Sequence, residues 1–248
     1  MSTKLFTSLS ALLVLALTSA CSVSNNAKQN VMAQSSADNV KQTRPAGVFS
    51  SVDVSRGVLL VYTQSDNVSI EVEAPDNVID KIITKIDDGK LKVSVDRSIT
   101  NINFNVIVRV SAPMVVDFEA GSGAGINVKS LNADGQEVDI EVSSGASVAF
   151  AAIKASKLDV ETGSGAQASV EGISAIAIDA EASSGSALNL TGTATTGKLD
   201  ASSGAMLDAS GLVINTASAE ASSGSTIVCH VKNFTSRETS SGGSISNN

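Results

Sequence analysis

The second half of the sequence repeats one short motif, an acidic strand-like segment followed by Ser-Gly, at nearly constant intervals. Aligned on the repeat glycine, the copies are centred on Gly123, Gly145, Gly165, Gly185, Gly204, Gly224 and Gly242. The spacings between successive glycines are 22, 20, 20, 19, 20 and 18 residues. A period near 20 residues is typical of stacked repeat proteins, in which one copy can bury its apolar side only against its neighbours.

Each position of the motif keeps its chemical character from copy to copy. Position −1, counted from the repeat glycine, is always Ser, and position +3 is always apolar. Position −5 is apolar in every copy except the last, which has Arg237. Position −4 is always acidic, with the residues Glu119, Glu141, Glu161, Glu181, Asp200, Glu220 and Glu238. Because neighbouring side chains of a strand point to opposite faces, the apolar columns are predicted to point inward and the acids outward.

This pattern predicts an all-β fold over residues 115–248, a parallel β-solenoid with one coil of about 20 residues per repeat. Coils stacked about 4.8 Å apart would place each column above itself. We expect a right-handed solenoid, because the strict six-residue motif of left-handed hexapeptide helices is absent. The repeat glycine is expected at a corner with positive φ. The serine before it is expected to bond to turn backbone or to the serine of the next coil.

Residues 46–114 are predicted to form a β-rich segment ahead of the repeats. β-branched or alternating runs indicate strands over residues 58–62, 68–72, 91–95 and 104–108. Asp87-Asp88-Gly89 is a hairpin-turn signal. The apolar residues of 78–86 fit one face of a helix and also fit a strand, and we favour a short helical turn followed by a strand.

Residues 1–20 have the pattern of a bacterial lipoprotein signal. Lys4 precedes an apolar run from Leu5 to Leu17, which is too short for a stable membrane anchor, and small residues lead to Cys21. We predict that Cys21 becomes the lipidated N-terminus, anchored on the extracytoplasmic side of the cell envelope, with the outer membrane expected. The alternative is an ordinary secretory signal with an incidental cysteine. Residues 21–45, rich in Ser, Asn, Gln and Ala, are predicted to be a flexible tether.

Composition excludes several classes of function. The formal net charge is −8 and the 17 Lys and Arg residues form no basic run, which argues against nucleic acid as a partner. Aromatic residues make up 3% of the chain, so Val, Ile, Leu and Ala must fill the core. Cys229 and His230 are adjacent, so on a strand they should diverge into a buried thiol and an exposed imidazole rather than form a nucleophile pair. With Cys21 acylated, Cys229 would have no disulfide partner.

The acidic columns are the most informative predicted surface. We call the outward carboxylates of the first four copies the acid face: Asp117, Glu119, Asp139, Glu141, Asp159, Glu161, Asp179 and Glu181. Two charges about 4.8 Å apart repel by roughly 0.9 kcal/mol in water, so something is expected to offset the repetition. One hypothesis is weak Ca²⁺ binding, and another is a solvated face that keeps the protein soluble and blocks edge pairing. We expect no Arg or Lys to stand beside these acids in the first four copies.

The leader, the Gly-Lys-Leu-Lys-Val segment at 89–93 and the repeated Ser-Ser-Gly or Gly-Ser-Gly turns are together similar to the GIN-domain family of auto-transporter adhesin heads. The resemblance covers residues 46–245. It implies a parallel β-solenoid on an extracytoplasmic surface with an adhesion role, and it brings no catalytic residues.

The sequence therefore predicts a non-catalytic, lipid-anchored surface-interaction domain, with a surface glycan or protein as the partner. A structural envelope protein without a dedicated ligand is the main alternative. A polysaccharide-cleaving solenoid could use paired carboxylates, but a catalytic site should break the repeat locally, and these acids are uniform. Ice or crystal binding through the serine column is a further alternative.

Overall fold

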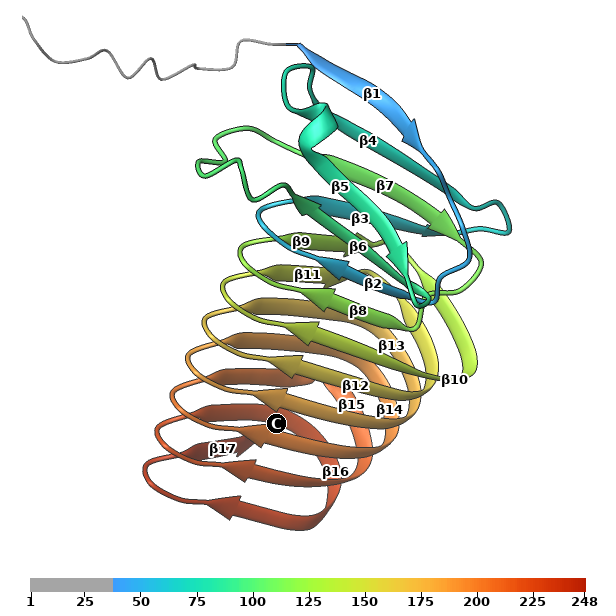
Figure 1. Cartoon of the computed structure of the whole chain (residues 1–248). Coiled ribbons are helices and arrows are strands. Elements are labelled where there is room, and N and C mark those ends of the chain that lie inside the picture. Colours follow the sequence, from blue (N-terminus) through green and yellow to red (C-terminus); the bar gives the residue numbers. More distant parts are fainter. Residues whose placement is uncertain (1–37) are drawn as a thin grey trace, which may run out of the picture. The chain divides into compact units, whose positions relative to one another are not determined.

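The computed structural model describes residues 38–248 and shows the repeats as coils of one solenoid (Figure 1). Its strands belong to one hydrogen-bonded sheet that winds around the core. The predicted signal peptide and Cys21 lie outside the described residues. Within the described part, no helix is long and apolar enough to cross a membrane.

Parallel pairing between consecutive coils keeps the motif in register. Ile140 lies opposite Phe118 on one side and opposite Val160 on the other, so position −5 stacks on itself. The strands of this region are β8 (Asp117–Ala120), β9 (Gly125–Val128), β10 (Leu131–Val142), β11 (Ser147–Phe150), β12 (Ile153–Thr162), β13 (Gln167–Ala182), β14 (Ala187–Ala201), β15 (Met206–Ala221), β16 (Thr226–Thr239) and β17 (Ser244–Asn247). The predicted β-solenoid with coils of about 20 residues is confirmed, whereas its handedness stays a prediction.

The core is narrow and filled mainly by aliphatic side chains. Val160, Leu199 and the other apolar residues at position −5 are buried, as expected for an inward column. Three aromatic rings contact one another edge to face across neighbouring coils. The ring centroids of Tyr62 and Phe118 are 5.7 Å apart, and those of Phe118 and Phe150 are 5.0 Å apart. This geometry adds a modest stabilisation to the area that the rings bury.

Each coil turns through a two-residue corner in which both residues are left-handed. The repeat glycines have φ between 68° and 80°, and the serines at position −1 have φ between 47° and 53°. Ala146 donates its N–H to the Ser143 carbonyl across the corner, which identifies a type I′ turn. Gly145 donates to the main-chain carbonyl of Ser164 in the next coil. The left-handed glycine was expected, whereas the left-handed serine was not.

The stack continues on the N-terminal side of the repeats. β2 (Ser51–Val54) and β3 (Leu59–Gln64) pair in parallel with β8 and β9, and Arg56-Gly57 forms the same left-handed corner between them. β6 (Lys90–Val95) and β7 (Ile107–Ala112) pair in parallel with β2 and β3 on the other side. The first coil of the chain therefore lies between two coils that are formed later in the sequence.

Antiparallel strands cover the N-terminal end of the stack (Figure 1). β5 (Ile82–Asp87) pairs with β6, while β4 (Ser69–Pro75) pairs with β7 and β1 (Asn39–Arg44) pairs with β4. The 3₁₀ helix η1 (Ile79–Lys81) precedes β5. Residues 46–114 thus contribute two kinds of structure. Some of their strands form coils of the solenoid, and others cover its end.

The structure confirms two local predictions and corrects two others. The hairpin at Asp87-Asp88-Gly89 and the short helical turn followed by a strand are confirmed. The strand predicted over 104–108 begins only at Ile107. The tether predicted over 21–45 is wrong for Asn39–Arg44, because these residues form β1. β1 is an edge strand with mostly exposed side chains, so it carries no apolar alternation that could reveal it.

Gly165→Ala should lower the free energy of unfolding by about 1 kcal/mol, because an L-residue side chain is strained at its φ of 70°. A Cβ atom there would meet no atom within 4 Å, so the cost is conformational rather than steric. Gly121→Ser is the control, since Gly121 has no left-handed φ and its Cβ would make an ordinary 3.7 Å contact. Urea denaturation measures both changes, and equal losses would contradict the turn assignment.

Candidate functional site

The acid face forms as one continuous surface on β8, β10, β12 and β13. Asp139 lies opposite Asp117 and Asp159, and Glu141 lies opposite Glu119 and Glu161, so carboxylates stack in two adjacent columns. The columns continue to Asp179 and Glu181 on β13. All eight predicted residues point outward and are exposed or half-buried. The structure thus brings the predicted residues together, whereas their binding role stays a prediction.

Sequence reasoning missed an acid at the N-terminal end of this surface. Asp53 on β2 is the register partner of Glu119, so it extends the column at position −4. Its signal was present in the sequence, because Asp53 stands four residues before Gly57, the glycine of an additional corner. Beyond β2, Lys92 on β6 lies opposite Asp53, and this end of the carboxylate column is therefore basic.

Three lysines neutralise parts of the surface, so the expectation that no Lys or Arg stands beside the acid face was wrong. Lys90 bonds Glu119 and lies 3.5 Å from Asp117. Lys157 lies 2.6 Å from Asp159 and 2.6 Å from Glu137. Lys198 pairs with Asp200 and Asp179. The alternation of side chains along a strand could have predicted Lys157 beside Asp159, because the two residues are two positions apart. Lys90 reaches the acid face only because β6 pairs with β2.

Burial and neighbouring charges shift the pKa values of three carboxyl groups on β10. Partial burial, and then the charges of Glu119 and Glu161, raise the pKa of Glu141. Burial and the neighbouring Asp159 raise the pKa of Asp139 in the same way. By contrast, a hydrogen bond from Lys157 lowers the pKa of Glu137. At Asp139 and Glu141, burial and then repulsion between stacked acids therefore disfavour the ionised form.

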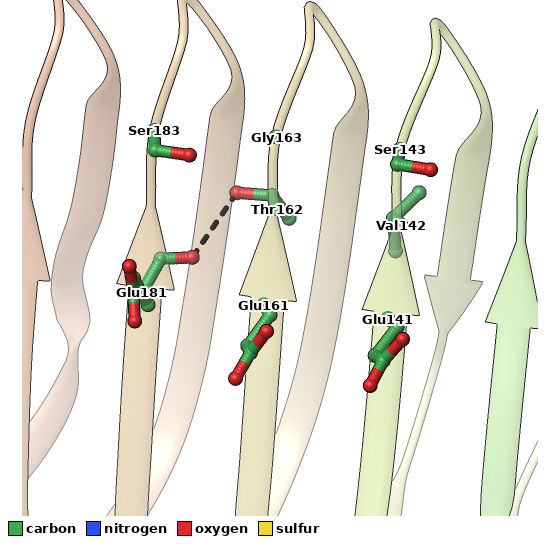
Figure 2. Close-up of a pocket in the computed structure, with 8 residues that line it drawn as sticks. All are labelled: Glu141, Val142, Ser143, Glu161, Thr162, Gly163, Glu181 and Ser183. Atoms are coloured by element: carbon green, nitrogen blue, oxygen red, sulfur yellow. Dashed lines mark hydrogen bonds between the residues drawn. The ribbon is translucent and has the colours of Figure 1, made fainter.

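A shallow groove follows the position −4 glutamates of three successive coils (Figure 2). Glu141, Glu161 and Glu181 lie side by side along it, and Ser143 and Ser183 stand at the adjacent corner. Gly163 takes the place of a serine between those two. Its volume of about 180 Å³ is below that of typical small-molecule pockets, so the groove suits cationic groups laid across the coils.

One cluster has the composition of a cation site. Carboxylate oxygens of Glu137, Asp139 and Asp159 lie within 4.8 Å of one another. Hard cations such as Ca²⁺ prefer oxygen ligands of this kind. However, the ammonium group of Lys157 already bonds Glu137 and Asp159, so the cluster carries its own positive charge. The geometry therefore gives Ca²⁺ binding at this cluster no additional support, and it stays a prediction.

The Cys229 and His230 pair is not arranged as a catalytic dyad. Cys229 is fully buried, as predicted, and burial raises the pKa of its thiol. The Cys229 sulfur lies 3.4 Å from the Ser246 carbonyl oxygen. His230 is half-buried rather than exposed as expected. A buried thiol with a raised pKa is a poor nucleophile, because the thiolate is the reactive form.

The fold and its surface define a class of protein, a β-solenoid domain with a shallow, repetitive, charged face. Residues 48–248 match the model of a family described as "Putative auto-transporter adhesin, head GIN domain". The chain belongs to this family. A comparison with curated proteins finds no match.

Solved structures share the fold at low sequence identity. A protein from Parabacteroides distasonis, described as a putative lipid binding protein, has a TM-score of 0.75 and 13% identity, over 86% of this chain and 98% of that chain. A putative adhesin from Bacteroides fragilis has a TM-score of 0.72 and 18% identity, over 86% of this chain and 99% of that chain. A putative adhesin from Parabacteroides merdae has a TM-score of 0.64 and 14% identity, over 86% and 97%.

Glu141→Gln should raise the free energy of unfolding at pH 7 by about 0.5–1 kcal/mol, because it removes repulsion from two stacked neighbours. The folded-state pKa of Glu141 is raised, so the native carboxyl opposes folding only when ionised. The gain should therefore fade as the pH falls through that raised pKa. Chemical denaturation between pH 4 and 8 measures the difference.

Glu137→Gln is the matched control and should have the opposite sign. The pKa of Glu137 is lowered by Lys157, so its charge favours the folded state above its unfolded pKa, and that benefit is lost in acid. The same sign for both variants would show that stacking does not govern the energetics of the acid face.

Proposed function

We propose that this protein is a non-catalytic surface-interaction domain whose acid face binds cationic groups of a partner. The supporting observation is the uneven placement of the lysines. Within residues 38–248, the cations beside the face pair with Asp117, Glu119, Asp159, Asp179 and Asp200. That pairing leaves the three stacked glutamates of the groove, Glu141, Glu161 and Glu181, without an ion pair.

Repetition gives this surface its binding strength. A single exposed ion pair contributes about 0–1 kcal/mol, so one carboxylate would hold a partner weakly. Several equivalent carboxylates along one rigid stack can engage a multivalent partner together, and avidity then multiplies the weak contacts. The partner we propose is a protein segment or glycan that displays several amino groups.

The charge distribution also favours the acid face as the surface that a basic partner meets first. Residues 113–248 contain 6 Lys and Arg against 15 Asp and Glu, whereas residues 38–112 contain 9 against 10. The negative potential is thus concentrated on the repeat coils. Such a field raises the rate at which a basic partner associates, and the effect weakens as salt increases.

The proposed location is the extracytoplasmic surface of the cell envelope, which agrees with the adhesin description of the family. In this proposal an acylated Cys21 anchors the chain in the outer membrane. The chain enters the fold at β1, at the end of the stack opposite β17 (Figure 1).

Two alternative functions make predictions that differ from those of this proposal. A structural envelope protein would carry the same acids for solubility and would bind no cationic partner. A polysaccharide-cleaving enzyme would need one pair of carboxylates that differs from the others. The register-stacked acids repeat with the coils, and the family description names an adhesin rather than an enzyme.

The test is binding of residues 38–248 to immobilised poly-lysine and to amino-sugar oligomers, at several salt concentrations and with or without Ca²⁺. We expect saturable binding that weakens with salt. The triple variant Glu141→Gln, Glu161→Gln, Glu181→Gln should bind at least about tenfold more weakly, which corresponds to roughly 1.4 kcal/mol.

The control variant removes the same charge elsewhere, through Asp66→Asn, Asp80→Asn and Glu171→Gln, all of which are exposed. It should keep most of the affinity. Equal losses in the two triple variants would mean that net charge alone acts. No binding by the unchanged protein would favour the structural alternative, and binding that requires Ca²⁺ would revive the metal hypothesis.

A further inference from the structure

The coil formed by β16 and β17 breaks two inward columns of the solenoid. Position −5 is apolar in the six preceding copies and is Arg237 here. Position +5 also changes from apolar residues to a polar one, along the series Val128, Phe150, Val170, Leu190, Ala209, Cys229 and Asn247. A coil with polar residues at these positions offers poor packing to any further coil.

The side chain of Asn247 replaces the strand pairing that an adjacent coil supplies elsewhere. Asn248 donates its N–H to the Cys229 carbonyl, so the backbone of Cys229 faces β17. By strand alternation the N–H and C=O of Val231 face the same side. The Asn247 Oδ1 atom accepts from the Val231 N–H at 2.8 Å, and its Nδ2 atom donates to the Val231 carbonyl at 3.0 Å. One side-chain amide thus makes both bonds that a neighbouring strand would make.

Arg237 likewise bonds a backbone group that a further coil would otherwise pair with, in this case on β17. Ser244 donates its N–H back to the Ser225 carbonyl, so alternation turns the carbonyl of Ile245 away from the stack. The Nη2 atom of Arg237 donates to that carbonyl. The guanidinium also lies 5.7 Å from the centroid of the Phe234 ring. A second coil stacked on this end would have to bury the guanidinium charge, which is costly without a new partner.

We propose that Arg237 and Asn247 form a polar cap that prevents a second copy of this protein from docking on the distal coil. An open edge of a sheet is a template for pairing with another chain. At the opposite end of the stack, antiparallel strands cover the edge. Without the cap, the distal edges of two copies would pair with each other across a two-fold axis, because each presents the same surface.

The first experiment tests the bonds to Val231 by hydrogen exchange in the full protein. Asn247→Ala should accelerate exchange of the Val231 amide at least tenfold and leave Val170, in an interior coil, unchanged. Lys232→Ala, an exposed substitution beside Val231, is the control and should change neither amide. Unchanged exchange at Val231 would overturn the cap.

The second experiment measures molar mass by light scattering over a hundredfold range of concentration. The unchanged protein should stay monomeric, whereas the double variant Arg237→Val, Asn247→Val should approach twice the monomer mass as concentration rises. Protected exchange at Val170 shows that the variant is folded. A folded double variant that remains monomeric at every concentration would overturn the proposal.

Discussion

In-register parallel hydrogen bonding between consecutive coils is the interaction on which the rest of the structure depends. It places each residue of the motif beside its equivalent in the next copy, so one geometry has two opposite consequences. For inward positions such as Ile140 and Val160 it builds a continuous apolar core. For outward positions such as Glu141 and Glu161 it stacks like charges, with an energetic penalty. The stability of the core is what allows the acid face to persist.

The corner of each coil sets the period that makes this register possible. Two successive left-handed residues reverse the chain within one turn, and the glycine N–H bonds the serine carbonyl of the next coil. A left-handed serine is strained, so this inter-coil bond helps to compensate the cost at every repeat except the last. Arg56 and Gly57 make the same corner outside the repeat region, which shows that the turn geometry, rather than the serine side chain, is the essential element.

Charge pairing then gives the uniform acid face its local differences. Lys90 neutralises one end, and Lys157 and Lys198 neutralise part of the column at position −6. The groove beside Glu141, Glu161 and Glu181 is what remains for an external cation (Figure 2). A repetitive sequence therefore produces a surface that is not equivalent along its length, because only some coils receive a lysine.

The sequence by itself determined the solenoid, its inward and outward columns, the hairpin at residues 87–89 and the membership of the acid face. These features are local or repeated seven times, so alternation and spacing reveal them. Only the tertiary structure decided that β1 is a strand, that β2 and β3 lie between later coils, and that Lys90 reaches Glu119. Those contacts join segments that are far apart in the sequence and outside the seven regular copies, and their register depends on long-range backbone pairing that no local pattern records.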